Sequence, residues 1–186
     1  MSRLSKLTVE GMTPEQREVH DAIAGGPRGA MGLVGPFGVY VRAPGVGNPA
    51  QALGAAVRFN TALPENLKEI GICVVGAHYR AKFEFAAHAE LAKKAGVDAK
   101  IVEAIRTGET PSFTRDDERI VHQLSTELIH TGRISDPTYS AGRDAIGETQ
   151  LIELVAALGY YSLVSLVLNA FEIPLREGMK DPFPEV

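Results

Sequence analysis

Apolar residues recur three and four positions apart along most of the chain, which is the spacing of the buried face of an α-helix. Capping residues, prolines and glycines divide this pattern into successive helices, and Thr13-Pro14-Glu15-Gln16 has the form of a capping box. The expected helices begin near residues 14, 48, 65, 98, 114, 135 and 151, and one more surrounds Glu84 and His88 and ends at Gly96. The one short run that alternates like a strand is Val39-Tyr40-Val41. The sequence therefore predicts an all-α fold.

A segment rich in glycine and proline, from Gly25 to Asn48, separates the first two expected helices. It is too long for a plain connection, and we interpret it as a lid or binding loop. It lacks the Gly-x-x-x-x-Gly-Lys-Ser/Thr spacing of a phosphate loop, so phosphate binding is not indicated. We expect one domain over residues 13–175, an N-terminal segment over 1–12 and an irregular tail over 176–186.

The stretch from Leu151 to Phe171 carries a single charge, Glu153, and is long enough to cross a bilayer. It also contains polar residues such as Tyr160 and Asn169, and no basic flank directly precedes it. We interpret it as a helix buried on every side in a soluble protein, with no membrane partner. Part of that burial is expected to be against a second copy of the chain, so a homo-oligomer is predicted.

The charge pattern and the cysteine count narrow the partners and the compartment. The formal net charge is −4, and the basic residues are scattered among acidic ones without forming a basic stripe, so nucleic acid is not an expected partner. The single cysteine, Cys73, excludes an intrachain disulfide and fits a reducing compartment. No apolar signal core follows the first residues, and we expect a cytoplasmic protein.

Glu84 and His88 lie one helical turn apart, near the middle of the apolar arc of their helix. Partial burial of a carboxyl group and an imidazole brings their proton affinities closer to neutral pH, which suits proton transfer. The competing interpretation is a structural pair, in which a core histidine is hydrogen-bonded to the preceding glutamate. The pair is therefore predicted as the centre of an acid–base site, with the structural alternative left open.

A metal site is a further alternative, since His78, Glu84 and His88 would supply two imidazoles and one carboxylate, a common set of three ligands. His78 precedes His88 by ten residues, however, and would point elsewhere in a continuous helix. We therefore predict no metal. Cys73 lies among isoleucines and valines and is expected to be a small buried hydrophobe without a chemical role.

Four groups of residues occur together along the chain: Leu63-Pro64 with Glu69, Phe85-Ala86-Ala87-His88 with Leu91 to Gly96, Arg133-Ile134-Ser135-Asp136, and Leu158-Gly159-Tyr160-Tyr161 with Leu168-Asn169-Ala170. In combination they resemble the carboxymuconolactone decarboxylase and alkylhydroperoxidase D-like superfamily. The resemblance covers most of the chain, from about Thr13 to Gly178. It implies an all-α, alkylhydroperoxidase D-like bundle of about seven or eight helices that assembles as an oligomer.

The resemblance also separates two kinds of chemistry. The peroxidase branch of the superfamily carries Cys-x-x-Cys before the matching histidine, whereas this chain has Ala81 and Glu84 there. Thiol–disulfide exchange needs an attacking and a resolving thiol, so a peroxidase cycle is disfavoured. The decarboxylase-like branch uses neither metal nor organic cofactor. It implies loss of carbon dioxide from a small unsaturated lactone or oxo acid in aromatic-compound catabolism.

Residue roles follow from the resemblance as a hypothesis. His88 would donate the proton, and Glu84 would orient the imidazole of His88. Glu69 would relay protons, and His78 would be a second proton donor. An arginine, Arg80 or Arg28, would bind a carboxylate of the small-molecule substrate. A helical oligomer of the same fold without catalytic activity is the alternative from another functional class.

Overall fold

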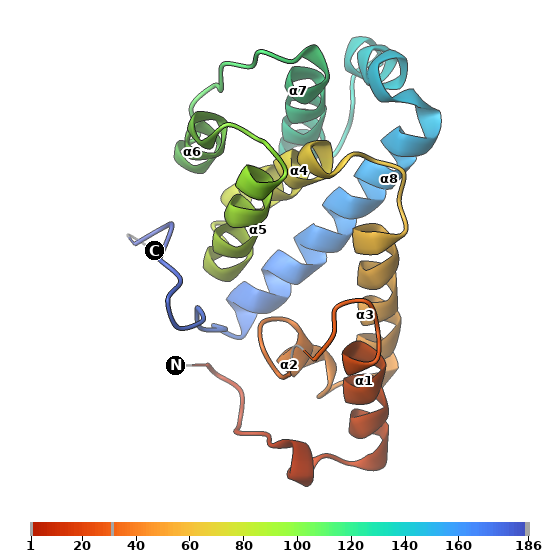
Figure 1. The fold of residues 1–186 in the computed structure, drawn as a ribbon, viewed down its shortest axis with the longest axis vertical. Helices are drawn as coiled ribbons and strands as arrows, with labels where there is room; N and C mark the ends of the chain where they lie inside the picture. Colours follow the sequence, from red (N-terminus) through yellow and green to blue (C-terminus); the bar gives the residue numbers. More distant parts are fainter. Residues whose placement is uncertain (1, 31, 185–186) are drawn as a thin grey trace.

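The computed structural model describes residues 2–30 and 32–184, and within these ranges it contains helices and no strands (Figure 1). The elements are η1 Val9–Gly11, α1 Pro14–Ala24, α2 Phe37–Tyr40, α3 Pro44–Phe59, α4 Glu65–His78, α5 Lys82–Lys94, α6 Ala99–Thr107, α7 Asp116–Thr131 and α8 Asp136–Ala170. The predicted all-α fold is confirmed.

Helix α4 is the centre of the main bundle and packs against α5, α6, α7 and α8. Its sequence is apolar on almost every side, and residues 67 to 76 are all buried. Gly71 allows α8 to approach closely, because a Cβ there would lie 3.0 Å from the Leu154 side chain and 3.2 Å from that of Leu158. A helix that contacts neighbours on all sides gives rigid positions to any polar side chain that it carries.

Local signals account for several helix ends. Thr13 and Gln16 form the predicted capping box of α1, and the Asp98 side chain accepts a hydrogen bond from the Lys100 amide at the start of α6. Gly108, after α6, has a left-handed backbone with φ of +77°, a conformation that glycine adopts without steric cost.

The segment predicted as a loop from Gly25 to Asn48 is partly helical. It contains α2, so the strand-like run at Val39 to Val41 is helical or follows the helix directly. Helix α3 begins at Pro44 and not at Asn48, and Pro49 lies within it. The earlier start depends on tertiary packing: a Cβ at Gly47 would overlap the backbone of Tyr40, so α2 and the first turn of α3 are in direct contact.

Helix α8 unites the two helices expected from residues 135 and 151. It bends at Gly147, whose φ of +79° and ψ of 161° are not helical. By length and composition α8 could span a membrane, but half of its most apolar window is buried inside the protein, where it packs against α3, α4, α5 and α7. That placement is typical of the core helix of a soluble protein.

A second apolar cluster lies beside the main bundle and joins α1, α2 and α3. Figure 1 shows these helices at the end of the molecule where α5 begins and α8 ends, the end that also holds the N-terminus. Between residues 172 and 184 the tail after α8 contains no helix or strand, yet Phe183 is only 2% exposed and packs against Phe85 of α5. The tail is therefore attached to the main core through an aromatic side chain.

Candidate active site

The imidazole of His88 is held between two carboxylates. Its Nδ1 atom lies 2.7 Å from Oε2 of Glu69, on α4, and its Nε2 atom lies 3.0 Å from Oε1 of Glu84, one turn earlier on α5. All three side chains are buried. The apolar length of α4 buries Glu69, and the i,i+4 spacing of α5 places Glu84 beside His88. The ring orientation of His88 is therefore fixed from both sides.

Arg58, near the end of α3, extends this arrangement on the side away from His88. Its guanidinium lies 3.0 Å from Oε1 of Glu69 and also pairs with Glu65 at the start of α4. Glu69 is completely inaccessible to solvent, so an ionised carboxylate there requires such partners. The contact of Arg58 with Oε1 of Glu69 is an ion pair and not a well-aligned hydrogen bond. The same holds for the contact of His88 with Oε1 of Glu84.

A cavity of about 340 Å³ opens onto Glu84 and His88. It lies where α2 and α3 of the second cluster face α5 and α8 of the main bundle. Its walls are mostly apolar or aromatic, and its polar groups are few: Arg28, Arg58, Glu84, His88, Tyr160, Tyr161 and Arg176. A concave apolar site with a few converging polar groups is the usual form of a small-molecule binding site.

The surroundings of His88 favour its protonated form. Burial alone disfavours the imidazolium, but the negative charges of Glu84 and Glu69 outweigh this effect and raise the pKa of His88 to about 10. The edge of the ring meets Tyr161 of α8, with 4.8 Å between ring centres. Burial also raises the pKa of Tyr161 well above its ordinary value, so this neighbour stays a neutral phenol. At neutral pH the site holds a charged acid between two carboxylates.

Arg28 reaches the same cavity from the loop after α1. Its guanidinium donates a hydrogen bond to the carbonyl oxygen of Gln51 and lies against the rings of Phe37 and Phe59. Gly54 provides the space for it: a Cβ at this position would lie 2.7 Å from the Arg28 guanidinium and would overlap the Tyr160 hydroxyl. The glycine-rich loop thus contributes one wall and one cation to the cavity.

The structure does not bring His78 or Arg80 to this cavity. His78 is the last residue of α4, and its ring packs on Tyr79 and His130. Arg80 adopts a left-handed backbone conformation, with φ of +47°, and its guanidinium lies over the Phe183 ring. Both residues line a separate cavity beside α7. The chain turns away between α4 and α5, and this turn separates them from Glu84 and His88.

The metal alternative receives no geometric support. Over residues 2–30 and 32–184, no three side chains of histidine, cysteine, aspartate or glutamate are arranged to hold a metal ion. His78, Glu84 and His88 are therefore not a common set of ligands. Cys73 is buried, and burial raises the pKa of its thiol well above the ordinary value, which agrees with the expected inert hydrophobe.

Sequence reasoning assigned no role to Arg58, Tyr160, Tyr161 or Arg176. Tyr160 and Tyr161 were recognised only as part of a motif, and Arg58 and Arg176 carry no local pattern that distinguishes them from surface arginines. They reach the site through the packing of α3, α8 and the tail against α5. No period or spacing in a single sequence reports such contacts.

Comparison with known proteins supports the fold. No protein-family model and no curated protein matches the sequence. A solved structure described as an alkylhydroperoxidase AhpD core, an uncharacterized peroxidase-related protein from Ralstonia eutropha JMP134, superimposes with a TM-score of 0.77 over 95% of this chain and 93% of its own, at 10% identity. The chain has the AhpD-like fold. An uncharacterized peroxidase-related protein from Silicibacter sp. TM1040 matches similarly, with a TM-score of 0.75 and 10% identity over 96% of this chain and 93% of its own.

The AhpD-like fold confirms the predicted resemblance at the level of architecture. At 10% identity, these structures carry no information about the reaction of this chain. The chemistry must therefore be argued from its own cavity and from the side chains that line it.

Proposed function

We propose that this protein is an acid–base enzyme that decarboxylates a small unsaturated lactone or oxo acid without a cofactor. One observation carries the proposal: a buried imidazolium, His88, is held between Glu69 and Glu84 at the edge of a small apolar cavity. Such an arrangement supplies both a positive charge and a transferable proton where water is largely excluded. It has the acid–base residues that the decarboxylase-like resemblance implies.

The reaction step assigned to this site is simple. The bond between the substrate carbon and its carboxylate breaks, carbon dioxide leaves, and the electron pair remains on the substrate as a dienolate. The imidazolium of His88 stabilises the developing negative charge. Because Nδ1 of His88 is occupied by Glu69, the proton leaves from Nε2 by way of Glu84, which lines the cavity, and reaches the dienolate carbon. Solvent then reprotonates the pair.

The roles of Glu69 and Glu84 differ in this proposal. Glu69 is fully buried, is anchored by Arg58 and fixes the orientation of the imidazole, so it is a positioning residue. Glu84 lines the cavity and contacts Nε2 of His88, so in this proposal it is the residue that touches the substrate. This assignment moves Glu84 from orienting His88 to carrying its proton, while His88 remains the source of the proton.

Peroxidase chemistry of the thiol type is the less favoured candidate. The two solved structures are described as peroxidase-related, but this chain has a single cysteine. Cys73 is fully buried on α4, and its raised thiol pKa opposes formation of the thiolate that such a reaction needs. The position one turn before His88 holds Glu84, a proton carrier and not a redox group.

The test is release of carbon dioxide from γ-carboxymuconolactone and a small panel of related unsaturated lactone acids. Wild type, His88→Gln and a control variant, His130→Gln, should be compared at equal concentration, since His130 lies outside the cavity. We expect release by wild type and His130→Gln and a loss of roughly a hundredfold or more in His88→Gln. Equal rates in all three proteins would exclude His88 as the acid.

A further inference from the structure

Three arginines line the cavity, and they differ in their ion pairing. Arg58 is paired with Glu65 and Glu69, whereas no ion pair involves Arg28 or Arg176 in the part of the chain that the structure describes. The charges of the buried groups offset one another, because two carboxylates face the imidazolium of His88 and the guanidinium of Arg58, which Glu65 shares. The guanidiniums of Arg28 and Arg176 therefore give the lining of the cavity an excess of positive charge.

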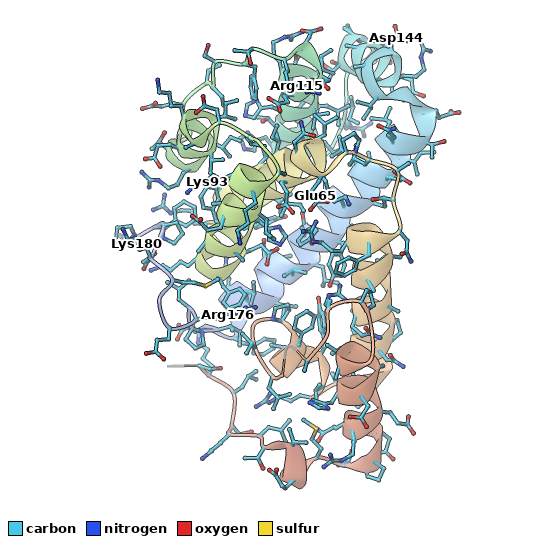
Figure 2. All side chains as sticks on the ribbon, viewed as in Figure 1. Glu65, Lys93, Arg115, Asp144, Arg176 and Lys180 are labelled. Carbon is cyan, nitrogen blue, oxygen red and sulfur yellow. The ribbon has the colours of Figure 1, made fainter. Side chains whose placement is uncertain are left out.

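Arg176 belongs to the tail after α8, which was expected to be an irregular extension outside the domain. Its guanidinium carbon lies 5.3 Å from the ring centre of Phe83, the residue before Glu84 on α5. In Figure 2, Arg176 lies where the tail meets the ends of α5 and α8, whereas Lys180 lies on the outer side of the tail. The tail thus places a cation beside the helix that carries the acid–base pair.

The tail is attached on both sides of Arg176. Before it, Glu172 pairs with Arg3 at 2.7 Å. After it, Asp181 pairs with Lys82 at 2.8 Å, and the Pro182 carbonyl oxygen accepts a hydrogen bond from Arg106. The buried ring of Phe183 then packs on Phe85, with 5.3 Å between ring centres. Lys82, Phe83 and Phe85 all belong to α5, so the tail and the acid–base helix form one packed unit.

We propose that the C-terminal tail is part of the substrate-binding site and that Arg176 binds the anionic group of the ligand at the cavity mouth. Arg176 touches a ring that lines the cavity, forms no ion pair with any residue of ranges 2–30 and 32–184, and is exposed enough to meet an incoming anion. An arginine that gains a carboxylate partner forms a charge-assisted, often bidentate hydrogen bond. The inference rests on the proposed function only in taking the ligand to be a carboxylate.

Binding of benzoate and of the uncharged isostere benzamide tests this role independently of turnover. The variants are Arg176→Gln and the matched control Lys180→Gln. The control removes the same charge from the same tail, but Lys180 lines a different cavity. Titration calorimetry at constant ionic strength should show benzoate binding weakened at least about tenfold in Arg176→Gln and unchanged in Lys180→Gln, with benzamide affinity equal in all proteins.

A second variant, Phe183→Ala, keeps the arginine at position 176 but removes the side chain that anchors the tail. We expect it to weaken benzoate binding in the same direction, at a temperature where circular dichroism shows intact helices. Equal losses in Arg176→Gln and Lys180→Gln, or no benzoate binding by wild type, would overturn the proposal. Arg176-dependent benzoate binding without carbon dioxide release would sustain it while refuting the decarboxylase function.

Discussion

Nδ1 of His88 lies 2.7 Å from Oε2 of Glu69, although the two residues are nineteen positions apart and belong to different helices. The contact joins the centre of the bundle to the cavity, because Glu69 lies on α4 and His88 on α5. It fixes which nitrogen of the imidazole faces Glu84. A buried carboxylate that orients a histidine also stabilises its charged form, so this contact controls both geometry and protonation.

Glu69→Gln tests the positioning role of this contact. The amide keeps the volume of the side chain but removes the charge that favours the imidazolium, so we expect the pKa of His88 to fall and kcat to decrease by about a hundredfold with little change in KM. Titration of the His88 ring by NMR measures the first effect and steady-state kinetics the second. A KM effect without a change in the titration would show that Glu69 serves only the packing.

The pH dependence of stability follows from the raised pKa of His88. In the folded protein this pKa is about 10, against the ordinary pKa of 6.5 for an unperturbed histidine, so the folded state binds a proton more tightly than the unfolded state. The stabilisation of the fold by protonated His88 is complete below about pH 6.5. It decreases as the pH rises from about 6.5 to about 10, and it is lost above about pH 10.

Urea unfolding at pH 7, 8.5 and 10 measures this linkage. We expect the free energy of unfolding of wild type to decrease with pH more steeply than that of His88→Gln, so that the difference between the two proteins changes steadily across the range. Other titrating groups are common to both proteins and cancel in the comparison. A constant difference would mean that His88 is neutral in the folded protein.

Local signals explain how far sequence reasoning succeeded with the fold. The Thr13 capping box and the Asp98 cap lie at observed helix starts, because capping depends on residues close in sequence. Helix α3 was predicted to start too late because its first turn depends on contact between Gly47 and the backbone of Tyr40. Such a close approach is a tertiary property, and the prolines at 44 and 49 offer two equally plausible starts.

The candidate site likewise contains residues that local sequence signals identify and residues that only tertiary packing brings to it. The Glu84 and His88 pair is visible from an i,i+4 spacing, and Glu69 was named through a family resemblance. Arg58 and Arg176 reach the cavity from α3 and from the tail, and no sequence period connects either residue to α5. His78 was assigned as a second proton donor through the same resemblance, but the turn after α4 directs it to another cavity.

Gly54→Ala should narrow the cavity without touching the acid–base residues. The added methyl would overlap the Tyr160 hydroxyl and press on the Arg28 guanidinium, so we expect a destabilisation of about 1–3 kcal/mol and weaker benzoate binding. Gly159→Ala on α8 is the matched control, since a Cβ there meets nothing within 4 Å. Thermal melting and calorimetry compare the two variants. Unchanged binding in Gly54→Ala would show that the ligand does not reach Tyr160.

One face of α8 leaves several large apolar side chains in solvent, spaced three, eight and three residues apart along the helix: Ile152, Val155, Leu163 and Leu166. Ile152 is 64% exposed and Leu166 is 52% exposed, and the face carries no charge. Apolar helix faces of this kind are usually covered by another protein surface. The predicted homo-oligomer would cover this one with a second copy of the chain.

Leu166→Glu tests this assembly, because a carboxylate within an apolar contact would have to be desolvated without a partner. We expect sedimentation to show a wild-type oligomer and a largely dissociated variant. The control, Thr114→Glu, introduces the same charge on an exposed loop residue outside this face and should leave the oligomer intact. A wild type that sediments as a monomer at all concentrations would contradict the predicted self-association while leaving the cavity and its chemistry unaffected.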